Sequence, residues 1–284
     1  MGVLIKSPIS GFADEISSDL QTQLVLLKKL DLRWLEFRSA GGVNVADHTL
    51  QQAEVVRQIL DAQNLRVSAV ASPLGKIGID EDFTAHMQRM EHVLDISDIL
   101  GCDQVRVFSF FIPKGDNPEV YAAEVFRRTE EMVAVAQKRG KCLLHENEKG
   151  IYGDTVDRCL KLMQTFGGKH YKAIFDFANF VECGQDTVAA YQTLRPYIHY
   201  IHIKDASAKT HEVVLPGSGD GQLAQVLHML DSDGYEGFLS LEPHLVDFAG
   251  LQGLEQNNAK VRGRIDGEEA FAQAHGALLS LLGR

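Results

Sequence analysis

The 284-residue sequence is short of cysteine, of positive charge and of long apolar runs, and each shortage argues against a class of protein. Its four cysteines show no C-x-x-C spacing, so we expect buried apolar fillers, not a disulfide framework or a zinc site. No apolar run approaches the roughly 18 residues that cross a bilayer. The net charge of -11 argues against nucleic acid or an anionic membrane as a partner. The first ten residues lack the features of a signal peptide, so a cytoplasmic protein is expected.

Short apolar runs alternate with helical patterns along the whole chain. Strands are expected at 8–12, 34–38, 65–72 and 103–110, and in four runs that end near residues 146, 176, 202 and 242. Helices are expected from a cap at Ser17 or Ser18 to Leu30, and then at 49–63, 82–100, 118–139, 155–166, 186–194, 222–232 and 268–282. Eight strand–helix pairs without a composition break predict an α/β fold, a single (β/α)8 TIM barrel, as one domain over residues 1–284. The irregular stretch 243–266 is expected to be a functional lid.

Four polar residues stand at the ends of the last four apolar runs, namely KCLLHEN, YKAIFDF, IHYIHIKD and GFLSLEP. They are Glu146, Asp176, His202 and Glu242. In a barrel the C-terminal ends of successive strands lie side by side, so these side chains are expected to meet at one point of the mouth. Each alone could be a helix cap, a loop anchor or a satisfied core group. Together, three carboxylates and one imidazole favour a site for Mn²⁺, with Mg²⁺ or Co²⁺ as alternatives.

Two neighbours compete with Glu146 as a candidate ligand. His145 and Glu148 could each take its place, but strand alternation puts His145 on the opposite face. A metal that chelates a carbonyl and an adjacent hydroxyl acidifies the C–H between them and stabilises the enediolate. Returning the proton to the other face inverts the centre, returning it to the next carbon isomerises the sugar, and expelling a β-hydroxyl dehydrates it. The metal site alone leaves these three outcomes open.

The segments HEN, FDFAN, HIKD, LEPH, LPGSGDG and GYEGFLSLE resemble the sugar isomerase/epimerase members of the xylose-isomerase-like barrels. The resemblance implies that Glu146, Asp176, His202 and Glu242 bind the metal. It also implies that the two glutamates act as acid and base on opposite faces of the substrate. The chain departs from the family pattern at three positions: Glu148 replaces a histidine, Asn179 replaces a substrate-binding histidine, and Ala208 replaces an arginine. These departures leave the metal ligands in place and the substrate open.

Further polar residues share the inward phase of their strands. Arg38, Lys204 and His244 are expected to contact the substrate, with a salt bridge as the alternative for Lys204. Asn179 is expected to contact it from the position of the family's histidine. Glu36 and Arg106 lie inside buried strands, where charges need partners, and both belong to even-numbered strands. We therefore expect Glu36 and Arg106 to pair across the barrel.

Two other segments have plainer interpretations. GSGDG (217–221) lacks the Lys-Ser/Thr of a phosphate loop and is expected to be a glycine turn. KVRGR (260–264) is a solvated charge run by default, but it could bind an anionic substrate or a neighbouring subunit in a homo-oligomer.

The sequence thus predicts a metal-dependent isomerase or epimerase of a small keto-sugar or keto-polyol. The alternative is a metal-dependent dehydratase of an inosose-like keto-polyol, and a non-catalytic sugar-binding barrel is less favoured. An endonuclease would need more histidine ligands and a basic groove.

Overall fold

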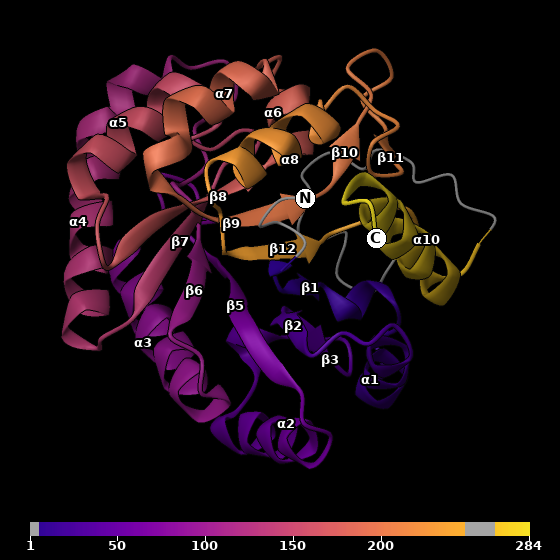
Figure 1. Ribbon diagram of the computed structural model, residues 1–284. Coiled ribbons are helices and arrows are strands. Elements are labelled where there is room, and N and C mark those ends of the chain that lie inside the picture. The colour runs from indigo at the N-terminus through magenta and orange to yellow at the C-terminus, as the bar shows by residue number, and fades with distance from the viewer. Residues whose placement is uncertain (1–5, 248–264) are drawn as a thin grey trace.

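The computed structural model describes residues 6–247 and 265–284, and its strands form the predicted barrel (Figure 1). Eight strands pair in parallel in the order β1–β12–β9–β8–β7–β6–β5–β2, and β1 lies beside β2. Their bounds are β1 Ile9–Gly11, β2 Trp34–Phe37, β5 Arg66–Leu74, β6 Gln104–Val107, β7 Cys142–Glu146, β8 Tyr171–Asp176, β9 Ile198–Ile203 and β12 Phe238–Leu241. The prediction of a (β/α)8 TIM barrel is confirmed.

Helices lie outside the ring of strands, and the eight predicted ones are present (Figure 1). They are α1 Leu20–Lys29, α2 Leu50–Ala62, α3 Phe83–Leu100, α4 Ala122–Lys138, α5 Val156–Phe166, α7 Thr187–Leu194, α8 Leu223–Ser232 and α10 Gly267–Leu281. The predicted cap of the first helix is wrong. Asp19, which directly precedes Leu20, caps α1 by accepting the N–H of Thr22 at 2.8 Å. A short helix that the sequence did not predict, α6 Phe177–Glu182, follows β8 at once.

Alternation along the strands separates two layers of side chains. The larger apolar core lies between strands and helices and includes Leu143, Phe175, Ile201 and Leu239. A smaller cluster of Ala69, Leu144, Ile174 and Tyr200 fills the barrel interior. The last three of these stand two residues before Glu146, Asp176 and His202, so they share the inward face and form the floor beneath those residues.

Two small antiparallel pairs extend the loops at the mouth: β3 Ser39–Ala40 with β4 Val43–Asn44, and β10 Asp205–Ala206 with β11 Val213–Val214. Most of the predicted lid, and all of KVRGR, lies outside the described residues. Among the residues that are described, none of the helices combines the length and the apolar character that a membrane span requires.

Candidate metal centre and active site

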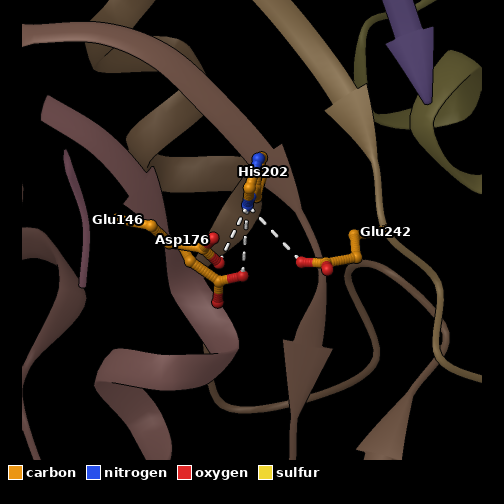
Figure 2. A group of neighbouring side chains, drawn as sticks. All are labelled: Glu146, Asp176, His202 and Glu242. Atoms are coloured by element: carbon orange, nitrogen blue, oxygen red, sulfur yellow. Dashed lines mark hydrogen bonds and ion pairs between the residues drawn. The ribbon is translucent and has the colours of Figure 1, made fainter. Parts of the chain in front are cut away.

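The four strand-end residues converge as the sequence predicted (Figure 2). Glu146 and Asp176 end β7 and β8, His202 lies in β9, and Glu242 directly follows β12. The His202 Nδ1 atom lies 3.1 Å from Glu146 Oε1, 3.4 Å from Glu242 Oε2 and 3.7 Å from Asp176 Oδ2. All four side chains are buried. One imidazole nitrogen therefore faces three carboxylate oxygens.

The two competitors of Glu146 lie elsewhere. His145 is on the outer face of β7, where its Nε2 lies 3.0 Å from the Ser109 hydroxyl. Glu148 pairs with Lys76, whose Nζ donates to Oε2 at 2.8 Å. Strand alternation therefore separates His145 from the cluster, and the Lys76 ion pair engages Glu148.

Asp176 combines the two roles that its position in the sequence allowed. Its Oδ1 accepts the backbone N–H of Asn179 at 2.8 Å and so caps α6. Its Oδ2 faces His202 and lies 3.7 Å from Lys204 Nζ. One carboxylate therefore fixes a helix and also contributes an oxygen to the cluster.

Basic and amide side chains hold the two glutamates. Arg106 Nη1 donates to Glu146 Oε2 at 3.0 Å, and the Asn179 side-chain amide lies 3.3 Å from Glu146 Oε1. Arg38 Nη1 donates to Glu242 Oε1 at 3.1 Å, and Lys204 Nζ lies 3.7 Å from Glu242 Oε2. Predicted substrate contacts therefore touch the cluster directly, namely Arg38, Lys204 and Asn179.

His244, the fourth predicted contact, belongs to a neighbouring group with Glu15 and Glu242. Its Nε2 lies 3.3 Å from Glu15 Oε1 and 3.5 Å from Glu242 Oε1. Glu15 also accepts from Arg38 Nη2 at 3.1 Å, and Asp14 binds the same guanidinium through two hydrogen bonds. The sequence interpretation missed Asp14 and Glu15, although two acids after the first strand resemble the signal used for the later strands.

The expected pair between Glu36 and Arg106 is wrong. Arg106 pairs with Glu146 because β6 neighbours β7, and their register places Arg106 beside Leu144, one inward position below Glu146. Glu36 instead reaches across the interior, where His202 Nε2 lies 3.1 Å from its Oε2. Both residues pair with side chains of odd-numbered strands of the barrel, so strand parity did not identify their partners.

Burial and charge set opposite trends in the cluster. Burial lowers the pKa of His202, but Glu36 and Glu146 outweigh it and raise the pKa well above its usual range. Burial raises the pKa of Asp176 to about 6, although Lys204 acts in the opposite direction. Asp176 therefore takes up a proton at a higher pH than an ordinary aspartate does, and the positive charge of a nearby divalent cation would oppose that shift.

The oxygen atoms themselves also fit a cation. Asp176 Oδ2 and Glu242 Oε2 are buried and accept no hydrogen bond from the residues that the structure describes. A buried carboxylate oxygen without a donor is costly. Both oxygens face His202 Nδ1, and each of the four residues offers one ligand atom that lies within 4.8 Å of the other three. This set of three oxygens and one nitrogen could hold a divalent metal ion.

A family model described as "Xylose isomerase-like TIM barrel" matches residues 24–264. The chain belongs to the xylose isomerase-like TIM barrels. It is 21% identical over 170 residues to the 3-dehydroshikimate dehydratase of Bacillus anthracis, covering 59% of this chain and 60% of that protein. It is 26% identical over 129 residues to the inosose dehydratase of Clostridium perfringens, covering 38% of this chain and 42% of the relative. The chain therefore spans less than two thirds of each of these relatives.

Solved structures of low sequence identity share the fold. A crystal structure of IOLI protein with a zinc atom has a TM-score of 0.74 and 14% identity, covering 97% of this chain and 98% of that one. The 3-keto-D-glucoside 4-epimerase of E. coli has a TM-score of 0.69 and 16% identity, covering 98% and 99%.

The glycine-rich segment of this xylose isomerase-like barrel forms a turn around a carboxylate. The backbone N–H groups of Gly217, Gly219 and Gly221 each donate to Asp205 at 2.9 Å. A side chain of the protein thus occupies the backbone groups that a phosphate would need, and the predicted glycine turn is confirmed. Asp205 follows Lys204, so this turn also fixes the loop that carries the lysine.

Replacing Asp205 by Ala is expected to lower the free energy of unfolding by roughly 2–4 kcal/mol, since the buried amides lose a charged acceptor. Asp220→Ala is the matched control in the same loop, because the side chain of exposed Asp220 accepts only the Ala208 N–H, at 2.7 Å, among the residues with described positions. Its expected effect is below about 1 kcal/mol. Urea unfolding followed by circular dichroism measures both, and equal effects would contradict the special role of Asp205.

Proposed function

We propose that this protein is a metal-dependent enzyme that removes a proton next to the carbonyl of a small keto-sugar or keto-polyol. Isomerisation or epimerisation is the first candidate. One observation carries the proposal: two buried glutamates, Glu146 and Glu242, approach the same imidazole nitrogen from different strands. Two carboxylates around one point suit the removal of a proton by one group and its return by another.

In this proposal Glu146, Asp176, His202 and Glu242 hold the metal, with Mn²⁺ as the first candidate and Mg²⁺, Co²⁺ or Zn²⁺ as alternatives. A divalent ion bound there would polarise a carbonyl oxygen as a Lewis acid. The proton transfers are assigned to side chains of the protein. Arg106 and Arg38 fix the carboxylates of the two glutamates, which act as base and acid.

Lys204, Asn179, Arg38 and His244 are the proposed substrate contacts. Lys204 Nζ donates to Asn179 Oδ1 at 3.3 Å, so a substrate oxygen could exchange with either partner. The buried basic groups at the mouth, Arg38, Arg106 and Lys204, all lie near carboxylates in the described ranges. Their charge is therefore already balanced, which favours a neutral substrate over a phosphorylated one.

A dehydratase of a cyclic keto-polyol is the second candidate. The curated relatives are named as dehydratases of 3-dehydroshikimate and of inosose. Dehydration begins with the same proton removal as isomerisation or epimerisation. It differs in the next step, because a hydroxyl group is then expelled. Lys204 favours this candidate chemically, because its ammonium group beside Asp176 and Glu242 can donate a hydrogen bond to a departing hydroxyl.

The remaining proposals concern setting and organisation. We propose that residues 1–284 act as one domain in the cytoplasm, on a small carbohydrate and without nucleic acid or membrane. A homo-oligomer stays a prediction.

Incubation with Mn²⁺ and a panel of ketoses and keto-polyols in D₂O tests the proposed reaction. We expect deuterium to appear at the carbon beside the carbonyl of at least one panel member. A deuterated product that has lost no water indicates an isomerase or epimerase, and a product that has lost water indicates the dehydratase. Binding of a panel sugar without any exchange would contradict both and favour the non-catalytic barrel. Mass spectrometry and ¹H NMR follow the products.

A further inference from the structure

Glu36 is a fully buried carboxylate on the inner face of β2, on the far side of His202 from the three carboxylates of the cluster. Its Oε1 and Oε2 lie 3.2 Å and 3.1 Å from His202 Nε2, and its Oε2 accepts the Ser240 hydroxyl at 2.7 Å. Figure 2 shows that the second imidazole nitrogen points away from Glu146, Asp176 and Glu242. The imidazole therefore lies between one carboxylate, that of Glu36, and the three carboxylates of the cluster.

The contacts of Glu36 are a poor way to stabilise a fold. In the described residues no lysine or arginine forms an ion pair with Glu36, and its charged partner is His202 alone. Burying a carboxylate without a permanent cation is costly, and an apolar side chain would fill the space more cheaply. Such a group points to a role at the site.

The backbone of β2 also departs from regular pairing at this residue. The register of β2 with β5 shifts between Leu35 and Glu36. Irregularities of this kind re-aim a side chain within a sheet. Here the result is a carboxylate that crosses the barrel from β2 to β9, two strands that are not neighbours.

We infer that Glu36 is a positioning residue that accepts the Nε2–H of His202 and so leaves Nδ1, which faces the three carboxylate oxygens, as the nitrogen that binds a cation. An imidazole binds a cation through one nitrogen only when the other carries the proton, and the hydrogen bond of that other nitrogen selects the tautomer. Glu36 also fixes the plane of the ring, and the Ser240 hydroxyl donates a further hydrogen bond to Glu36. The inference rests on the proposed metal centre.

The test compares Zn²⁺ affinity in the full chain after treatment with a chelator. Zn²⁺ alone is titrated calorimetrically into the wild type, Glu36→Leu, Glu36→Gln, Ser240→Ala and His202→Ala. We expect Glu36→Leu to weaken binding about 10- to 100-fold. Glu36→Gln keeps an acceptor oxygen and should recover part of the loss, and it also serves if the leucine variant does not fold. Ser240→Ala keeps the acceptor and should stay near the wild type.

A second readout reports the tautomer directly. In protein labelled with ¹⁵N-histidine, the Nε2-bound proton of His202 should give a downfield, slowly exchanging signal, with and without Zn²⁺. Glu36→Leu should shift it upfield and speed its exchange, which a purely structural role would not do. Wild-type affinity and an unchanged signal in Glu36→Leu would overturn the inference alone, provided that His202→Ala binds weakly. Equal affinity of the wild type and His202→Ala would overturn the metal centre itself, and this inference with it.

Discussion

Glu242→Gln and Glu146→Gln are each expected to lower the rate of deuterium exchange into the substrate by about 10²–10⁴-fold. This corresponds to roughly 3–5 kcal/mol in the activation free energy. The amide keeps the size of the side chain, and its oxygen can still accept from Arg38 or Arg106. It can no longer take or return a proton, so chemistry should suffer more than folding.

Glu148→Gln is the matched control, because it makes the same change two residues beyond Glu146. Glu148 contacts Lys76 and not His202, so its loss should leave exchange within a few-fold of the wild type. Metal affinity is measured for all three variants, since a lost ligand would also lower the rate. Full turnover by both Glu146→Gln and Glu242→Gln at saturating metal would show that the acid/base assignment is wrong.

The cluster itself could be predicted because each member ends an apolar run. A period of two fixes the face of a side chain, and the parallel order of strands fixes its neighbours. These two rules place Glu146, Asp176 and His202 on adjacent strands facing one point. Glu242 follows the same logic one strand further on.

The partners of the cluster could not be predicted in this way. Whether Glu36 reaches Arg106 or His202 depends on strand tilt and on the irregular register at Leu35, and neither is written in the alternation of polar and apolar residues. Asp14 and Glu15 lie in a 3-10 turn, Ala13–Glu15, where the strand period gives no face. The unpredicted helix α6 is shorter than the window in which helical periodicity can be recognised.

Loss of the metal is expected to abolish activity, and Asp176 offers a way to remove affinity without removing a structural contact. Asp176→Asn keeps an amide oxygen that can accept the Asn179 N–H and cap α6. It replaces the second oxygen, which faces His202, with a neutral group. Asp176→Ala removes both. We expect both variants to be as inactive as chelator-treated wild type.

The two variants should differ in stability when no metal is present. The alanine change leaves the N-terminus of α6 uncapped, which costs about 1 kcal/mol, whereas the asparagine change preserves the cap. The wild type should gain about 2.7 kcal/mol in unfolding free energy when Mn²⁺ is present at 100 times its Kd. Neither variant should gain as much at that concentration. Chemical unfolding with EDTA and with Mn²⁺ measures all of these differences.

An asparagine variant that is stabilised by Mn²⁺ as much as the wild type would place the ion elsewhere, since a neutral amide oxygen is a weaker ligand than a carboxylate. The group of Glu15, Glu242 and His244 would then be the next position to test. Asp176→Asn could lose the stabilisation by Mn²⁺ and still regain activity with excess Mn²⁺. That result would mean that Glu146, His202 and Glu242 suffice for the chemistry. Only the joint loss of stabilisation and exchange assigns Asp176 both to the ion and to the helix.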